Sequence, residues 1–185
     1  MVSVGIALAI VLVPALWLIA VYNRLVKLRQ HIRDSWAGID VELKRRYELI
    51  PNLVETVRGY AAHERETLAR VVELRNRAQA STGRAGAQAA DEGPLLLALR
   101  QVFVVAEAHP QLRADSNFRA LQDELAITED RIAAARRFYN GNVRDMNAMC
   151  ASFPTNLVAS MFGFQAEEFF ELMDEAERIV PRVAV

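Results

Sequence analysis

The chain has 185 residues, a formal net charge of −1 and a single cysteine, Cys150. This length accommodates a membrane anchor and one domain of about 160 residues. The balanced charge gives no basis for nucleic-acid binding, and a lone cysteine excludes an intrachain disulfide.

The N-terminal segment carries no charged side chain before Arg24 and is almost entirely aliphatic. About 20 such residues cross a hydrocarbon core as a helix, and Trp17 and Tyr22 lie toward its far end, where interfacial aromatic residues are common. A cleaved signal peptide is the alternative, but it requires a basic start, a shorter apolar run and a small-residue cleavage site. The sequence therefore predicts an uncleaved transmembrane helix over 1–23 and a domain over 24–185.

Basic residues follow this segment directly, at Arg24, Lys27, Arg29 and Arg33. The positive-inside rule then predicts a single-pass protein of the cell (inner) membrane, with the N-terminus outside and the domain in the cytoplasm. These four residues are predicted lipid contacts, because basic groups near the surface are attracted to anionic headgroups. Basic residues 44–46 lie farther along and are predicted to pair with acids such as Asp40 and Glu42.

Apolar residues recur at spacings of three and four nearly throughout, which is typical of amphipathic helices and predicts an all-α fold. The first such stripe runs from Leu25 to Ile50 without a turn, so we expect the anchor to continue into the domain's first helix. The same phase continues beyond Pro51 to Leu74. Pro51 either kinks one long helix or begins a second, and the unbroken phase favours a kink.

Residues 80–93 are small, include glycine and lack a stripe, so they are predicted to form a mobile loop. A helix is then predicted from Pro94 to about Ala108. Asp115 or Ser116 is expected to cap the next helix.

The most regular pattern runs from Phe118 to Met149 in a 3-4 rhythm, which predicts coiled-coil-like packing in a bundle. Phe153-Pro154 ends this helix. A last helical region is predicted after it, broken once at Gly163. Its expected buried face consists of Phe169, Leu172, Met173, Ala176 and Ile179.

The search for chemistry predicts no catalytic, cofactor-binding or metal-binding residues. The HERET segment at 63–67 lacks the second histidine of a zinc helix. An acidic cluster could bind a cation, but a solvated helix face is favoured. Its members are Glu167, Glu168, Glu171, Asp174, Glu175 and Glu177. Cys150 has no neighbouring histidine in the sequence, and a core or interface thiol is favoured over a nucleophile.

Asn140 and Asn147 lie seven residues apart, each directly after an apolar stripe position. They therefore share one flank of a helix. The favoured interpretation is hydrogen bonds that fix the register between helices, and the alternative is a partner or peptide site.

Four stretches together resemble the LemA family of bacterial membrane proteins: YNRLVKLR at 22–29, SWAGIDVELKRRYELIPNLVETVRGYAAHE at 35–64, FRALQDELAITEDRIAAARRFYNGNV at 118–143 and FPTNLVASMFGFQAEEFF at 153–170. One departure is Met146-Asn147, where the family often has a second Tyr-Asn pair. The resemblance implies a single-pass protein whose soluble part is an antiparallel four-helix bundle. It also implies a loose link to membrane metalloproteases and envelope homeostasis, and of one branch to organelle membrane formation.

The family has no agreed set of functional residues, so the matching motif positions are interpreted as structural or interaction residues. They are Tyr22, Asn23, Pro51, Asn52, Tyr139, Asn140, Asn147, Pro154, Gly163 and Phe164. We expect a membrane-anchored, non-enzymatic scaffold or adaptor without a cofactor, whose partners are the bilayer, other proteins and a second copy of the chain. The alternatives are a membrane-shaping or lipid-binding protein and a metal-dependent enzyme that uses carboxylates of the last helix.

Overall fold

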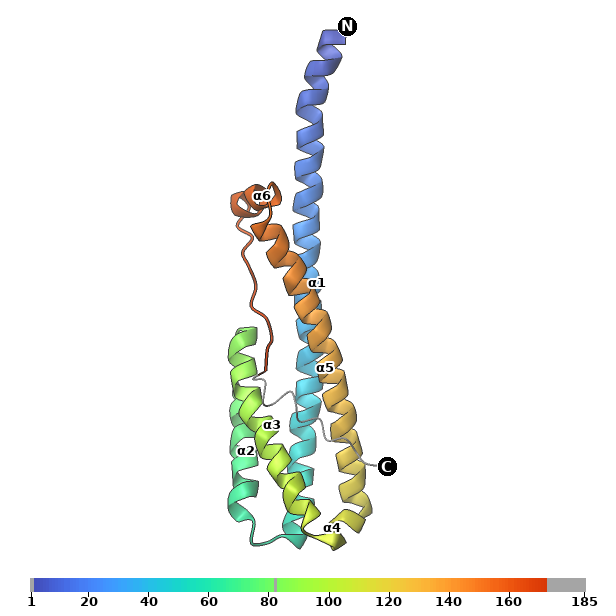
Figure 1. Cartoon of the computed structure of the whole chain (residues 1–185), viewed down its shortest axis with the longest axis vertical. Helices are drawn as coiled ribbons and strands as arrows, with labels where there is room; N and C mark the ends of the chain where they lie inside the picture. Colours follow the sequence, from blue (N-terminus) through green and yellow to red (C-terminus); the bar gives the residue numbers. More distant parts are fainter. Residues whose placement is uncertain (1, 82, 173–185) are drawn as a thin grey trace. The chain divides into compact units, whose positions relative to one another are not determined.

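The computed structural model describes residues 2–81 and 83–172, and every regular element in these ranges is a helix (Figure 1). The prediction of an all-α fold is confirmed. The helices are α1 (Val2–Tyr60), α2 (Arg65–Ala80), α3 (Ala85–Glu107), α4 (Pro110–Ala114), α5 (Ser116–Ala151) and α6 (Thr155–Met161).

The chain divides into two compact units, and both α1 and α5 contribute to each of them. Unit 1 contains Met1–Trp36 and Phe138–Glu167. Unit 2 contains Ala37–Arg137 and Glu168–Val185.

The N-terminal part of α1 in unit 1 is both apolar and exposed. An 18-residue stretch of the helix has a mean hydropathy of 1.6, and only 11% of it is buried. Ile10 and Val13, for example, are 67% and 65% exposed. The core helix of a soluble domain would bury such residues, whereas here they are exposed. By its length and apolar composition, this segment could cross a membrane.

The α1 helix passes Pro51 without ending, so Pro51 does not begin a second helix. The single helix nevertheless ends at Tyr60, and the chain turns through residues 61–64 before α2 begins. The expectation that one helix continues toward Leu74 is therefore wrong. An unbroken apolar stripe shows that both segments bury one face, but it does not show that they form one continuous helix.

Unit 2 is a bundle in which parts of α1 and α5 pack with α2 and α3, each helix running opposite to the one before it (Figure 1). Most of its core is apolar, with Ile39, Ile50 and Leu53 of α1 fully buried, as are Val71 of α2 and Leu95 of α3. Each such side chain contributes about 1.5–3 kcal/mol on burial. The stripes read from the sequence therefore account for the packing.

The predicted loop over 80–93 is wrong for most of its length, because α3 begins at Ala85. Pro94 lies well inside the helix and does not start it. Alanine, glutamine and glutamate are good helix formers, and the buried positions Gln88, Ala89 and Glu92 anchor this turn to the bundle. The cap of α5, in contrast, is confirmed: the Phe118 N–H donates to Asp115 Oδ1 at 2.9 Å.

The chain beyond α6 is not helical through residue 172, so the predicted helical face at Phe169 and Leu172 is wrong. Phe170 is the buried residue there, with 0% exposure. Met173, Ala176 and Ile179 of the predicted face lie outside the described residues.

Candidate functional site

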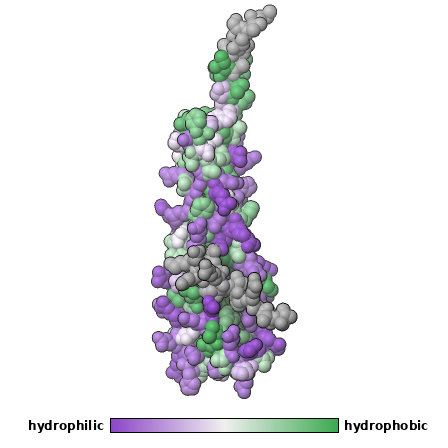
Figure 2. Space-filling view, in the orientation of Figure 1, coloured by the Kyte–Doolittle hydropathy of each residue, from purple (hydrophilic) through white to green (hydrophobic). Residues whose placement is uncertain are grey.

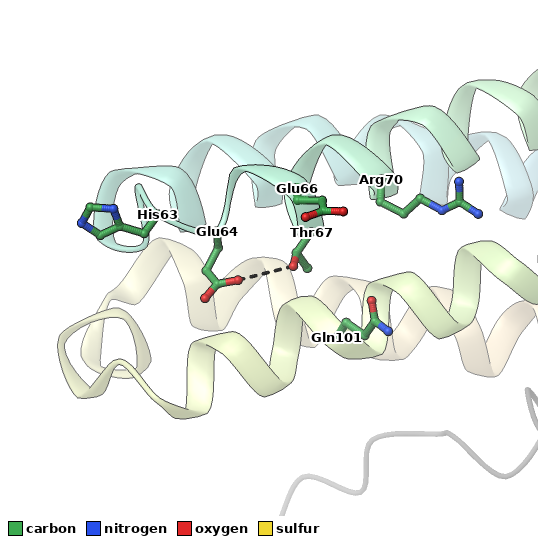
Figure 3. A pocket seen from close by; sticks show the side chains of 6 residues that line it. All are labelled: His63, Glu64, Glu66, Thr67, Arg70 and Gln101. Atoms are coloured by element: carbon green, nitrogen blue, oxygen red, sulfur yellow. Dashed lines mark hydrogen bonds between the residues drawn. The ribbon is translucent and has the colours of Figure 1, made fainter.

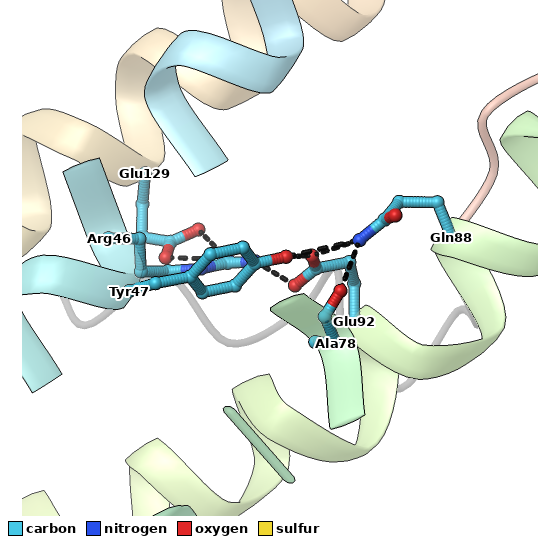
Figure 4. Close-up of polar contacts among 6 residues, drawn as sticks. All are labelled: Arg46, Tyr47, Ala78, Gln88, Glu92 and Glu129. Atoms are coloured by element: carbon cyan, nitrogen blue, oxygen red, sulfur yellow. Dashed lines mark hydrogen bonds and ion pairs between the residues drawn. The ribbon is translucent and has the colours of Figure 1, made fainter. Parts of the chain in front are cut away.

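A network of charged and polar side chains lies inside unit 2 (Figure 4). Arg46 of α1 is 1% exposed, and it forms ion pairs with Glu92 of α3 and Glu129 of α5. The Arg46 Nη1 atom donates to the Glu129 carboxylate at 2.8 Å. One guanidinium thus joins three helices through charge-assisted hydrogen bonds, which are stronger than neutral ones.

Two further side chains complete the coordination of the buried Glu92 carboxylate. The Tyr47 hydroxyl donates to Glu92, and Gln88 Nε2 donates to Glu92 Oε1 at 2.8 Å. The same Gln88 nitrogen lies 3.1 Å from the Ala78 carbonyl oxygen, which brings α2 into the network (Figure 4). Buried polar groups need such partners, because an unpaired group costs its full desolvation energy.

The network holds Arg46 and Tyr47 in fixed protonation states. Burial lowers the pKa of Arg46, but the charges of Glu129 and Glu92 outweigh burial and raise this pKa overall. Burial, together with the negative charge of Glu92, also raises the pKa of Tyr47. The guanidinium therefore stays charged and the phenol stays neutral, so both act as fixed donors within the bundle.

The basic run at 44–46 was only partly predicted. Lys44 pairs with Asp40 at 2.7 Å, as expected for an i,i+4 pair. Arg45 instead donates to Glu124 at 2.6 Å, and Arg46 turns inward to Glu92. The local prediction fails for these two arginines because acids on other helices lie closer to them.

An aromatic cluster organises unit 1 around the end of the apolar segment. The ring centroids of Tyr22 and Phe162 lie 4.8 Å apart, and those of Tyr22 and Phe164 lie 5.9 Å apart. The Arg29 guanidinium carbon lies 4.9 Å from the centre of the Phe164 ring, a cation–π contact. These contacts attach the chain after α6 to α1.

Gly163 makes this attachment geometrically possible by ending α6. Its φ of +70° lies in the left-handed region that favours glycine. The Phe164 N–H donates to the Ala159 carbonyl at 2.9 Å and the Gly163 N–H donates to the Ser160 carbonyl at 3.4 Å. This is the Schellman pattern, and it sends Phe164 back toward Tyr22.

The side chain of Asn147 binds a later part of the chain, and it contacts only the backbone there. Its Nδ2 donates to the Glu167 carbonyl at 3.0 Å, and its Oδ1 accepts from the Glu167 N–H at 2.8 Å. We call this pair of hydrogen bonds the Asn147 clamp. Asn147 therefore binds a non-helical segment of its own chain, so these two hydrogen bonds do not fix the register between two helices.

Comparison with known protein families identifies the family of this chain. The model of the LemA family matches residues 35–184 of the chain. The chain belongs to the LemA family. The resemblance read from the sequence is thereby confirmed.

Three related proteins are similar to this LemA-family chain at low identity. Magnetosome protein MamQ 2 of Paramagnetospirillum magneticum is 24% identical, over 81% of this chain and 64% of its own length. Magnetosome protein MamQ of Magnetospirillum gryphiswaldense is 22% identical, over 80% of this chain and 64% of its own length. Protein LemA of Metamycoplasma hominis is 25% identical, over 85% and 71%. The chain thus spans 64% of the length of the MamQ relatives that it matches.

The structure brings together only some of the LemA motif residues. Tyr22, Gly163 and Phe164 meet in the aromatic cluster, and Arg29 joins them as the one half-buried member of the predicted basic set. Tyr139 is buried with its ring centroid 5.4 Å from that of Trp36, and Asn140 is half-buried beside it. The remaining predicted positions are exposed: Asn23, Arg24, Lys27, Arg33, Pro51, Asn52 and Pro154.

The segment around HERET lines a pocket in unit 2 (Figure 3). The lining side chains are His63, Glu64, Glu66, Thr67, Arg70 and Gln101. Thr67 Oγ1 donates to the Glu64 carboxylate at 3.4 Å. Across residues 2–81 and 83–172, no group of three or more histidines, cysteines, aspartates or glutamates is placed to hold a metal ion.

The acidic cluster and Cys150 were the other candidates for chemical reactivity, and among the described residues neither has the surroundings of a reactive site. Glu168 pairs with Arg84 at 3.2 Å, while Asp174, Glu175 and Glu177 of the acidic cluster lie outside the described residues. Burial, and secondarily the charge of Glu167, raises the pKa of the Cys150 thiol. A raised pKa disfavours the nucleophilic thiolate.

Sequence reasoning missed the buried network around Glu92. One local signal was present: Gln88 and Glu92 are four residues apart, so they share a helix face with buried Ala85 and Ala89 nearby. Small residues around two polar ones on one face indicate a crowded polar contact between helices.

Proposed function

We propose that this LemA-family protein is a membrane-anchored, non-enzymatic helical scaffold that presents a face of unit 2 to partner proteins, among them a second copy of itself. The observation that carries the proposal is the pair of exposed aliphatic residues beside the Arg45–Glu124 ion pair. Val41 is 63% exposed and Ile127 is 45% exposed. We call these four residues the α1/α5 face.

The four residues of the α1/α5 face lie close together because of the ion pair. Arg45 Nη2 lies 2.6 Å from Glu124 Oε2, which joins α1 to α5 at this point. Val41 lies one turn before Arg45, and Ile127 lies one turn after Glu124. Aliphatic side chains grouped around an arginine form the kind of surface that protein interfaces use.

The internal chemistry of unit 2 supports a scaffold more than an enzyme. Arg46, Glu92 and Tyr47 direct their polar groups toward one another and thereby hold helices together. Groups that transfer protons usually have pKa values near the working pH, whereas the pKa values of Arg46 and Tyr47 are raised away from neutrality.

The proposal places residues 1–23 across the inner membrane, with the N-terminus outside and unit 2 in the cytoplasm. Its support is the apolar, exposed start of α1 followed by exposed Arg24, Lys27 and Arg33. A reporter fused after Val185 tests the orientation. Activity only for a reporter that works in the cytoplasm is expected, and activity only outside it would reverse the orientation.

Site-specific photo-crosslinking in intact cells tests the scaffold role. A photoreactive residue at position 41 or 127 of the full chain should give discrete crosslinked products, whereas one at exposed Glu55 should give few. Two differently tagged copies in one cell separate self-association from other partners. A membrane metalloprotease is one partner to look for by mass spectrometry, since the family resemblance implies it. Equal crosslinking at 41, 127 and 55 would contradict the proposal.

Lipid binding by the basic residues is a second candidate, supported by the exposure of Arg24, Lys27 and Arg33 next to the apolar segment. Each basic residue near an anionic surface contributes about 1 kcal/mol. Their joint replacement by glutamine should lower the anionic lipid fraction that co-purifies with the full chain in native nanodiscs. Arg113→Gln, an exposed position in unit 2, is the control. An unchanged lipid fraction would remove this role.

A further inference from the structure

Unit 1 exposes a second group of apolar side chains, on α6 and its two flanks. We call it the α6 apolar surface; it consists of Phe153, Leu157, Met161 and Phe162, which are 79%, 56%, 69% and 45% exposed. Leu157 and Met161 are four residues apart and so share one face of the helix. Val158 and Ala159 are buried and already attach α6 to the unit. The exposed face is therefore surplus to the packing of unit 1.

The sequence around α6 is also free of charge. No lysine, arginine, histidine, aspartate or glutamate occurs between Asp145 and Glu167. A quarter of the whole chain is charged, at 24%, so an exposed stretch of this length without charge is unusual. Figure 2 shows apolar residues gathered where Figure 1 places α6. Monomeric soluble proteins rarely expose such contiguous apolar areas.

The aromatic cluster relates the α6 apolar surface to the end of the predicted transmembrane segment. Phe162, a member of the α6 apolar surface, lies with its ring centroid 4.8 Å from that of Tyr22. Tyr22 is the last residue but one before the first charged side chain, Arg24. If the preceding residues cross the hydrocarbon core, Tyr22 lies at its boundary, where tyrosine and tryptophan are enriched. The α6 apolar surface therefore lies next to that boundary, because its member Phe162 contacts Tyr22 directly.

We propose that the α6 apolar surface inserts into the boundary between headgroups and acyl chains of the same bilayer that α1 crosses. The inference rests on the proposed anchoring by α1 and adds a second membrane contact to it. Because α6 and its flanks carry no charge, the contact depends on apolar burial and not on anionic lipid. Arg29, stacked on Phe164, supplies a positive group beside it for the headgroups.

A depth measurement on the full chain tests this contact. Leu157→Cys in a Cys150→Ser background carries an environment-sensitive fluorophore, and the chain is placed one copy per nanodisc in zwitterionic phosphatidylcholine. The acyl chains carry doxyl quenchers near the headgroup end. Two matched labels are Trp17→Cys in the anchor and Ala114→Cys at an exposed position of unit 2.

We expect the label at 157 to be quenched about twofold more strongly than the label at 114, because an interfacial helix buries its apolar face about 5–10 Å into the bilayer surface. Quenching at 17 but not at 157 would overturn the α6 contact and leave the anchor intact. Absence of quenching at both 17 and 157 would overturn the anchor as well. A blue shift at 157 without quenching would mean that protein covers the surface, which also contradicts the proposal.

A second variant checks that the surface itself makes the contact. Met161→Glu should reduce the quenching of the label at 157 toward that at 114, while the label at 17 keeps its quenching. Ser160→Glu places the same charge at a neighbouring exposed position outside the surface and should change the quenching less. An equal effect of the two substitutions would contradict insertion through this face.

Discussion

The two units of this LemA protein specify their packing by different physical means. Unit 2 joins its helices through a buried guanidinium whose partners, Glu92 and Glu129, come from two other helices. Unit 1 relies on stacked rings and on the Asn147 clamp, and it exposes the α6 apolar surface. Buried charges select their partners strictly, since an unpaired one is costly, whereas rings and backbone contacts tolerate an apolar environment. This difference is what we expect if unit 1, as proposed, contacts a bilayer and unit 2 does not.

The largest test of this comparison removes a carboxylate from unit 2. Glu92→Ala leaves Arg46 with only Glu129, removes the acceptor of the Tyr47 hydroxyl and takes one acceptor from Gln88, which keeps the Ala78 carbonyl. Breaking a buried ion pair on one side costs about 3–5 kcal/mol. Thermal unfolding of the full chain in detergent, followed by circular dichroism, should show this loss. Glu48→Ala, at an exposed position of α1, is the control and should change stability little.

A paired replacement sharpens the same test. Arg46→Met combined with Glu92→Gln removes the buried positive charge together with one negative partner. Its loss of stability should be smaller than that of Glu92→Ala alone, because neither a buried guanidinium nor a buried carboxylate is then left without its counter-charge. A loss as large as that of the single variant would show that the charge pair itself stabilises unit 2.

The second test compares two glycines of unit 1. Gly163→Ala forces alanine into a φ of +70° and should destabilise the end of α6 by about 1–2 kcal/mol. Gly141→Ala lies within α5, with no atom within 4 Å of the added methyl group, and should stabilise the chain by about 0.5–1 kcal/mol. Thermal unfolding should therefore give opposite signs. The same sign for both would contradict the left-handed turn.

The third test opens the Asn147 clamp. Asn147→Ala removes both hydrogen bonds to the Glu167 backbone. A net hydrogen bond is worth about 1 kcal/mol, so amide exchange at Glu167 should become at least about fivefold faster. Hydrogen exchange measured by mass spectrometry detects this change. Asn52→Ala, at an exposed position of α1, should leave that exchange unchanged.

The smallest expected effect is a pH dependence at the cap of α5. The Phe118 N–H, and to a lesser extent the Tyr60 hydroxyl, donate to Asp115 and lower the pKa of its carboxyl group below the usual value for aspartate. A pKa that is lower in the folded state adds stability above the unfolded value, and this stability is lost as pH falls through the folded value. The melting temperature should fall more steeply from about pH 5 to about pH 3 than it does in Asp115→Asn. Parallel slopes would contradict this cap.

Local patterns in the sequence predicted what depends on one face of one helix. The stripe from Leu25 to Ile50, the apolar start of α1 and the Asp115 cap all follow from spacing within a few residues. The buried network could not be predicted in this way, because Arg46 meets partners 46 and 83 residues away along the chain. Its pairing is a property of the assembled bundle.

The prediction of a helix after Gly163 failed for a related reason. The phenylalanines and acids from 164 to 172 suit an amphipathic helix, and nothing local forbids one. The backbone conformation is decided by contacts with other elements: Phe164 packs on Tyr22, and Asn147 takes up the backbone hydrogen bonds of Glu167. Tertiary contacts thus override a helical pattern that the residues themselves permit.

The Asn147 clamp also bears on how the sequence can change over evolution. It reaches only the amide and carbonyl of residue 167, so it is indifferent to the side chain there. Mutations at this position can accumulate without loosening the chain, and proline alone is excluded because it has no N–H to donate. A single asparagine thus frees its partner position to drift while keeping the path of the backbone in place.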